Sequence, residues 1–410
     1  MKDQFLFDSK LKSGLLITMV IGAVLFGVGS YSAGNIYRAW AVILHNSLFF
    51  TLVALASVFF ITAHTLAYGG YFNIFRRVPE SISRFVTVGG GILFLLMILL
   101  VLDAKGIFHT GISHLYHWMQ AGITDPSATN FDKIITFKSG FLNLTNFVVL
   151  TIIFVGAWIF FARRFCTISL NEDKEGGLQS YDATRINAAL FAILFAVSSS
   201  VFAWIWLMSI NPHWYSTLYG WYCFASFWVS GISVICLICI FLKERGYLEY
   251  MNENHFHDLG KFMFGFSVFW TYLWFSQYML IWYANIPEET AYFNERFHGY
   301  KYWFFINLII NFVVPFLFLM KRANKRSLNR LRVIGTIIIF GHWLDYYLLV
   351  IPGSLRHNGG GDFNDLWLAE IGFVTFIIGL FLYTTFSYLS RVPMYAKNHP
   401  FIKESLTHQI

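Results

Sequence analysis

The sequence feature that most limits the possible folds is the long uncharged run from Phe262 to Ala284. A run of this length can cross the roughly 30 Å hydrocarbon core of a bilayer as one helix. It carries polar side chains, among them Thr271, Ser276 and Gln277, which a helix surrounded only by lipid has little reason to contain. Polar atoms at that depth need partners on neighbouring helices or in a wet cavity. We therefore expect this helix inside a membrane bundle.

The composition of the whole chain also indicates a membrane protein. Of its 410 residues, 57% are hydrophobic and 12% are charged, and the mean hydropathy is +0.57. These values are typical of multi-pass membrane proteins and exclude an ordinary soluble domain. The net charge of +7 comes from cations in short segments between apolar runs. We therefore expect lipids around the chain and no nucleic-acid partner.

Ten apolar runs are long enough to span a bilayer. They cover residues 13–31, 41–66, 83–103, 141–162, 187–210, 219–242, 262–284, 302–320, 331–351 and 366–389. The sequence thus predicts an all-α polytopic membrane protein with ten transmembrane helices and both termini on one side. The opposite side would hold only a few cations, which are Arg38, Lys105, Lys133, Lys138, Arg296, Lys301 and Arg356. The positive-inside rule then predicts that both termini are cytoplasmic.

Several polar residues within these spans are candidates for a proton route, because ionisable groups are costly in a membrane. His342 and Asp345 lie three residues apart on one helix face, so the imidazole and the carboxylate can meet. A buried pair of this kind can exchange protons near neutral pH. The other candidates are His45, Glu370, Asp103, Gln277 and His64. The alternative for each is a hydrogen bond that fixes helix packing.

No motif in the sequence indicates a catalytic residue, a resident cofactor or a metal site. His109, His114 and His117 fall in an amphipathic piece from Ile107 to Met119, which we expect to lie on the membrane as a short helix. The cysteines do not form an iron–sulfur motif, and the histidines do not pair as haem ligands. Any redox cofactor would therefore belong to partner subunits.

Several motifs resemble a known family. They are His257-Asp-Leu-Gly-Lys261, Phe275-Ser-Gln-Tyr278, Trp282-Tyr-Ala-Asn-Ile-Pro-Glu-Glu-Thr290, the turn from Met208 to Tyr219, and Gly341-His-Trp-Leu-Asp-Tyr-Tyr347. The chain from about Ala188 onward resembles the NrfD/PsrC-like integral membrane subunits of bacterial alternative complex III, a quinol:electron acceptor oxidoreductase. Relatives often have acidic residues where this chain has Ile205 and Asn211, which puts a proton role for those two positions in doubt.

The resemblance implies an architecture and a set of partners. It implies two four-helix bundles, within residues 41–210 and 219–351, flanked by the spans at 13–31 and 366–389. It also implies the bacterial inner membrane, a homologous NrfD-like partner subunit named ActC, and further subunits that carry haem c and iron–sulfur clusters. A cytochrome oxidase would dock to the complex. Menaquinol or another quinol would be oxidised nearby in a respiratory electron-transport chain.

In such a complex this chain would bind no cofactor itself, and would contribute a proton route and a surface near the quinone. The sequence leaves two other functions open. A purely structural scaffold subunit would use the same polar groups for helix association. An independent transporter would need broken helices in both halves, whereas only Pro315 and Pro352 interrupt or end spans, both late in the chain. On each of these readings the chain is not expected to be an enzyme by itself.

Overall fold

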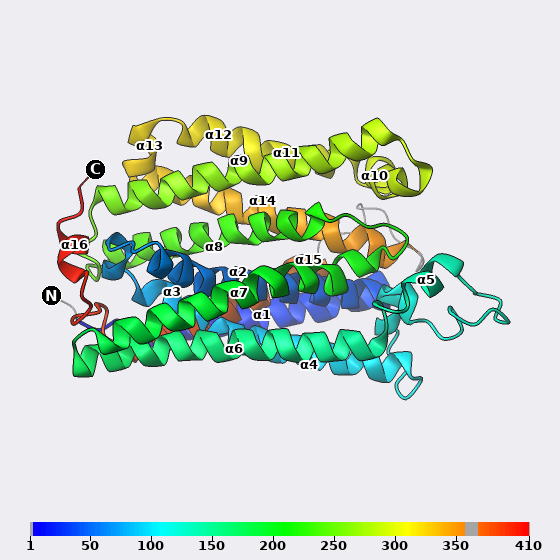
Figure 1. Cartoon of the computed structure of the whole chain (residues 1–410), viewed down its shortest axis with the longest axis horizontal. Helices are drawn as coiled ribbons and strands as arrows, with labels where there is room; N and C mark the ends of the chain where they lie inside the picture. The colour runs from blue at the N-terminus through cyan, green and yellow to red at the C-terminus, as the bar shows by residue number, and fades with distance from the viewer. Residues whose placement is uncertain (1–2, 357–367, 410) are drawn as a thin grey trace.

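The structure, a computed structural model, describes residues 3–356 and 368–409. Within these residues the chain is helical, and its one β contact is an isolated bridge between Gln4 and Pro393. The long helices lie side by side along the longest axis of the molecule (Figure 1). Both termini lie at one end, which we call the terminal end, and helix α10 lies at the other, which we call the α10 end.

The helices fall into long and short ones. The long helices are α1 (Ser9–Ala33), α2 (Ile36–Leu66), α4 (Phe85–Ala104), α6 (Leu144–Glu175), α7 (Gln179–Trp206), α8 (Leu218–Glu244), α9 (Glu253–Ala284), α14 (Leu328–Leu355) and α15 (Leu368–Leu389). The short ones are α3 (Arg77–Ser83), α5 (Lys133–Lys138), α10 (Pro287–Gly299), α11 (Lys301–Leu308), α12 (Val314–Leu319), α13 (Arg322–Arg326) and α16 (Ile402–Leu406). Four 3₁₀ turns are η1 (Tyr71–Ile74), η2 (Ile112–Leu115), η3 (His117–Met119) and η4 (Met208–Ile210), and a π-helical turn is η5 (Ile309–Val313).

Nine helical segments of the described chain are long and apolar enough to cross a membrane. The all-helical, multi-pass architecture expected from the sequence is thus confirmed. Helix α9 has 32 residues, about 48 Å at 1.5 Å per residue, but it is not among the nine. Its polar and aromatic residues lower its hydropathy, so the count of ten spans stays a prediction. The last apolar run was expected to begin at residue 366, and residues 366 and 367 lie outside the described part.

The long helices contact one another in two groups. Helix α2 packs on α4 and α7, and α6 packs on the same two helices. Helix α8 packs on α9 and α14, and both of these also contact the segment formed by α11, η5 and α12. Helix α2 joins the groups because it packs on α8 and α14 as well. The interior between α8, α9, α11 and α14 is where the polar residues described below meet.

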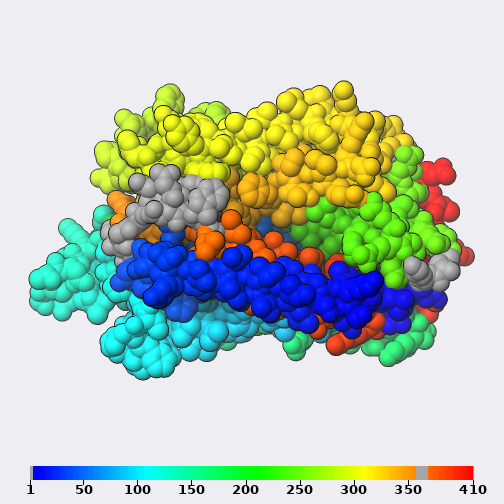
Figure 2. All heavy atoms as spheres, turned by 180° about the vertical axis from the view of Figure 1, so that it is seen from behind, coloured from blue at the N-terminus to red at the C-terminus, as the bar shows by residue number. Residues whose placement is uncertain are grey.

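Helices α1 and α15 form a close pair at the edge of the molecule, and α1 runs along the face seen in Figure 2. Glycines make the approach possible. A Cβ atom on Gly372 would lie 2.2 Å from the backbone nitrogen of Phe26, and one on Gly22 would lie 2.4 Å from that of Phe376. No larger residue fits at such distances, which is typical of tightly packed membrane helices.

The segment from Ile107 to Met119 differs from the expected amphipathic helix. It forms only the short turns η2 and η3, and Tyr116 and Trp118 are buried under the α10 end of the bundle. The carboxylate of Asp103 folds the segment back by accepting hydrogen bonds from Thr110, Gly111 and Ser113. The prediction of a helix on the membrane surface was therefore wrong, because local hydrogen bonds and burial hold this segment against the protein.

Candidate functional site

A single carboxylate, that of Asp345, is the most elaborately bonded polar group inside the second group of helices. Asp345 is 1% exposed. Its Oδ1 accepts hydrogen bonds from the hydroxyl of Tyr222 and from Nδ2 of Asn307, the latter at 2.8 Å. Its Oδ2 accepts from Oγ of Ser226 at 2.8 Å and from Nε1 of Trp270 at 3.1 Å. Four donors fill the acceptor positions of an ionised carboxylate.

Four helices supply this arrangement, which we call the Asp345 site (Tyr222, Ser226, Trp270, Asn307, His342 and Asp345). Tyr222 and Ser226 are one turn apart on α8, so both point toward the same neighbour. Trp270 comes from α9 and Asn307 from α11. Helices α8, α9 and α14 lie next to one another in Figure 1. The site therefore exists only when these helices are packed together.

The π-helical turn η5 orients the asparagines of the site. Pro315 follows the turn and has no N–H to donate back to the preceding turn, where its ring also crowds the backbone. The extra residue of a π turn relieves this conflict, and such turns are frequent at functional sites. Nδ2 of Asn311 donates to Oδ1 of Asn307 at 2.6 Å, and Asn311 packs against Gly341, where a Cβ would lie 2.3 Å from its Oδ1. The turn thus aims Asn307 at Asp345.

His342 joins Asp345 through a hydroxyl rather than directly. Oγ of Ser226 lies 3.0 Å from Nδ1 of His342 and also donates to Asp345. Since a serine has one hydroxyl hydrogen, Nδ1 must carry a proton and donate to Ser226 in this arrangement. Nε2 of His342 then has a lone pair, is buried, and has no hydrogen-bond partner among the described residues. The result is a chain from imidazole to hydroxyl to carboxylate.

A small cavity adjoins Asp345 on the side of the α10 end. It has about 20 Å³ of room for the centre of a water molecule, which is enough for at least one. Gln277, Arg296, Asn307 and Asp345 all contribute to its walls. Arg296 is 2% exposed, donates from Nε and Nη2 to the carbonyl of Leu348, and lies over the ring of Tyr292. A water held here would contact the carboxylate on one side and the base of α10 on the other.

The sequence named only some members of this site. His342, Asp345 and Gln277 were among the candidates, and the structure brings all three to the same place. Tyr222, Ser226, Trp270 and Asn307 were not. The hydroxyls of Tyr222 and Ser226 at a four-residue spacing were a usable signal, because they place two donors on one face of an apolar helix. Nothing local marks Asn307 as their partner.

His45 lies elsewhere, between α2 and α14. Its Nε2 is 3.0 Å from the carbonyl of Trp343, and its ring meets the rings of Trp343 and Tyr347. The neighbouring Asn46 accepts a hydrogen bond from Nε1 of Trp343 at 2.9 Å. These contacts join the two helix groups. His45 thus contacts Trp343, which follows His342 in α14, but it forms no hydrogen bond with the carboxylate of Asp345.

Glu370 and Asp103 each have a partner of their own. Glu370 is 2% exposed and accepts from Nε of Arg38 at 2.9 Å, which ties the start of α15 to the start of α2. Asp103 ends α4 and holds the following turn, as described above. Neither residue reaches Asp345 by any contact that the structure records. The residues named as candidates for a proton route therefore do not all meet in one place.

His64 lies toward the terminal end. Its Nδ1 is 2.8 Å from the carbonyl of Phe60 and its Nε2 is 2.7 Å from the hydroxyl of Tyr71. The tail that contains α16 covers this region, where Nε2 of His408 is 2.7 Å from Asp258. Burial raises the pKa of Tyr71 well above its ordinary value, with a further contribution from Asp258. His64 therefore belongs to a second polar region, separate from the Asp345 site.

A buried group of charges lies at the terminal end and was not predicted from the sequence. We call it the ion cluster (Arg76, Arg77, Glu80, Glu172 and Asp173). Nε of Arg76 donates to Glu80 at 2.9 Å, and its Nη1 donates to Glu172 at 3.1 Å. Arg77 pairs with Glu80 at 2.6 Å and with Asp173. Both arginines lie between the apolar runs at 41–66 and 83–103, yet each is at most 1% exposed. Their carboxylate partners come mainly from the distant helix α6.

The described histidines outside the spans do not gather around a possible metal. Among the residues that the structure describes, no group of three or more His, Cys, Asp or Glu side chains could hold an ion. Nε2 of His213 is 2.6 Å from Asp132, which also caps α5. Burial alone would raise the pKa of Asp132, but hydrogen bonds from His213 and from the amide of Ile135 lower it below its ordinary value.

Sequence comparison places the chain in no known group. No family model matches it, and no curated protein sequence matches it. The function is therefore inferred from the Asp345 site and from the motifs quoted above.

Proposed function

We propose that this chain is a cofactor-free, multi-pass subunit of a quinol-oxidising respiratory complex, and that the Asp345 site carries protons within it. The observation that carries the proposal is the chain from His342 through Ser226 to Asp345, next to a cavity large enough for water. A buried carboxylate bonded only by neutral groups can change its protonation state without breaking an ion pair.

The proton path follows from which donors can rotate. A proton that arrives at Nε2 of His342 makes an imidazolium, which can pass its Nδ1 proton to Ser226. The serine hydroxyl passes its own hydrogen to Oδ2 of Asp345, so that the imidazole and the carboxyl group are both neutral. Tyr222 and Ser226 can turn their hydroxyls to accept from the protonated carboxyl, whereas Trp270 and Asn307 can only donate through N–H. Water beside Gln277 would then take the proton toward the α10 end.

The wider setting of the proposal rests on the resemblance and on charge. The apolar runs support ten spans, and the distribution of cations supports a cytoplasmic terminal end. The motifs support a place in bacterial alternative complex III of the inner membrane, in the position of its ActF subunit beside ActC. Subunits with haem c and iron–sulfur clusters would take the electrons, menaquinol or another quinol would donate them, and a cytochrome oxidase would receive them.

Two serines on one helix provide a matched test. Ser226→Ala removes the bridging hydroxyl, while Ser230→Ala removes a hydroxyl that bonds only to the carbonyl of Ser226 in its own helix. In the assembled complex we expect proton release during quinol oxidation to fall at least tenfold for Ser226→Ala and to stay within twofold for Ser230→Ala. Equal rates for the two variants would remove the relay from the mechanism.

A purely structural scaffold is the second candidate, because Asp345 also ties four helices together. The two functions predict different defects when a residue of the Asp345 site is substituted. A scaffold defect appears as missing subunits on a native gel, with normal proton release by whatever complex remains. A relay defect leaves assembly intact. A subunit of either kind should purify with coloured, haem-containing partners, whereas an independent transporter would purify alone.

A further inference from the structure

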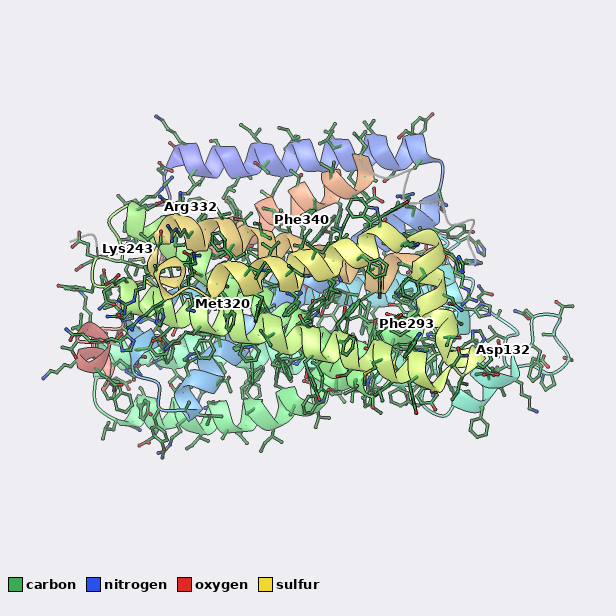
Figure 3. The ribbon with its side chains drawn as sticks, turned by 90° about the horizontal axis from the view of Figure 1, so that it is seen from above. Asp132, Lys243, Phe293, Met320, Arg332 and Phe340 are labelled. Carbon is green, nitrogen blue, oxygen red and sulfur yellow. The ribbon has the colours of Figure 1, made fainter. Side chains whose placement is uncertain are left out.

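A groove runs along the described surface between α14 and α15, with α2 and α8 at its floor. It encloses about 630 Å³. Phe340 and Trp343 of α14 line one wall, and Val374, Ile378 and Phe381 of α15 line the other. In Figure 2, α15 lies in a recess between α1 and the segment of α11 and α12, and Figure 3 labels Phe340 in this region. The groove is separate from the Asp345 site and has no part in the proton path.

The groove has the length and position of one hydrocarbon chain in a membrane. Its α15 wall runs from Glu370 to Leu382, about 18 Å along the helix. One leaflet contributes roughly 15 Å of the 30 Å hydrocarbon core. The wall starts at the first turn of α15, near the α10 end, and continues toward the middle of the bundle. A chain that follows it would lie parallel to the helices.

Three polar side chains of the lining have partners of their own. Nε1 of Trp343 donates to Asn46, the hydroxyl of Thr336 donates to the carbonyl of Arg332, and Glu370 accepts from Arg38. A ring with two oxygens, such as a quinone, needs hydrogen-bond partners that these groups do not offer. A saturated acyl chain needs none, and it covers apolar side chains such as Phe340, which is 50% exposed.

We propose that the groove between α14 and α15 binds one acyl chain of a membrane phospholipid as a tightly held structural lipid. The chain lies against Val374 and Ile378, and the headgroup lies at the membrane interface beyond Glu370. The lipid then fills the space that separates the pair of α1 and α15 from α14. This site is independent of the proton route, so each can fail without the other.

A light-activated phospholipid tests the site in the complex purified from its membrane. Phosphatidylethanolamine with a diazirine in one acyl chain is added, activated, and mapped by mass spectrometry. We expect labelled peptides from residues 336–347 and 371–382 to exceed those around Ile193, which is 71% exposed on α7 and represents ordinary lipid contact. Excess unlabelled phosphatidylethanolamine should lower the groove labelling at least fivefold, and excess menaquinone should not.

Two variants add a matched comparison. Val374→Trp fills the groove and should reduce its labelling at least fivefold, while Ile193→Trp adds the same bulk on α7 and should leave it unchanged. Three outcomes would each overturn the proposal. They are displacement of the probe by menaquinone alone, labelling spread evenly over all lipid-facing helices, and cross-links from the groove to another protein chain. Because the competition uses the unaltered protein, it decides the matter even where Val374→Trp does not fold.

Discussion

The Asp345 site and the ion cluster are both buried and both bind helices together, but they neutralise charge in different ways. In the ion cluster, two arginines face three carboxylates, and the pairs Arg76–Glu80 and Arg77–Glu80 are 2.9 Å and 2.6 Å apart. In the Asp345 site, one carboxylate is held by four neutral donors. Among the described residues no ion pair reaches Asp345, whereas every acidic member of the ion cluster has one.

This difference bears on what each region can do. A proton on a carboxylate of the ion cluster would leave a buried arginine without its full partner, which is costly. A proton on Asp345 needs only the rotation of a hydroxyl on Tyr222 or Ser226. Paired charges are therefore suited to holding helices together permanently. A carboxylate bonded to hydroxyls, with no charged partner, is suited to gaining and losing protons. Removing charge from each region should separate these two roles.

The largest effect on stability is expected from Arg77→Met. The change leaves Glu80 and Asp173 buried without one of their cations and removes the donor to Oγ of Ser169. Breaking a buried pair in this way costs about 3–5 kcal/mol. Chemical unfolding in detergent, followed by circular dichroism, measures the change. The control is Arg164→Met, an exposed arginine on α6, which should shift unfolding by less than about 0.5 kcal/mol. Equal changes in the free energy of unfolding for the two variants would show that the ion cluster does not hold the helices together.

A smaller change in stability, but a large change in function, is expected from Asp345→Asn. The asparagine keeps one carbonyl oxygen, and the Tyr222 or Ser226 hydroxyl can rotate to accept from the new amide. The loss of hydrogen bonds to a charged group should cost about 1.5–3 kcal/mol. In the proposed quinol-oxidising complex, proton release should drop to the background of the complex. If Asp345→Asn unfolds as readily as Arg77→Met, or if its complex still releases protons, the two regions do not differ in the way described.

The smallest effect is expected from the partly exposed pair of Asp132 and His213, which sets the scale for an ion pair in contact with water. The pKa of Asp132 is lower in the folded chain than its ordinary value, so the carboxylate stabilises the fold above that ordinary value. As the pH falls through 3.8 toward the lowered pKa, this contribution disappears.

Thermal unfolding from pH 7 to pH 3 compares the wild type with Asp132→Asn, which keeps the cap of α5 because asparagine also accepts from the helix N–H groups. The wild type should be more stable by less than about 1 kcal/mol at pH 7, and the difference should shrink as the pH falls toward 3. A difference that grows on acidification would contradict the sign of the pKa shift.

Much of the fold was predictable because the hydrocarbon core imposes a length and a polarity on every segment that crosses it. The apolar runs all coincide with helices wherever the structure describes them. Boundaries were less predictable: α6 continues to Glu175, well beyond the expected end at residue 162. The extra turns carry Glu172 and Asp173 of the ion cluster, and hydropathy does not distinguish a solvated charge from one paired with a distant arginine.

The candidate site was predictable only in part. His342 and Asp345 were identifiable because two ionisable groups on one face of an apolar helix are unusual. The bridging role of Ser226 was not, since a serine in a membrane helix most often bonds to its own backbone, as Ser230 does here. Likewise, the sequence shows Glu370 and Asp345 only as acidic residues within predicted spans. The packing of the helices reveals that Glu370 faces Arg38 and that Asp345 faces neutral donors.

The sequence by itself determined that this chain is a bundle of membrane-crossing helices with polar groups in its interior, because apolar length and periodicity are local properties. The tertiary structure decided which of those groups meet. Hydrogen bonds and ion pairs act over about 3 Å, and whether Tyr222, Trp270 and Asn307 come that close to Asp345 depends on the packing of four helices that no local pattern specifies.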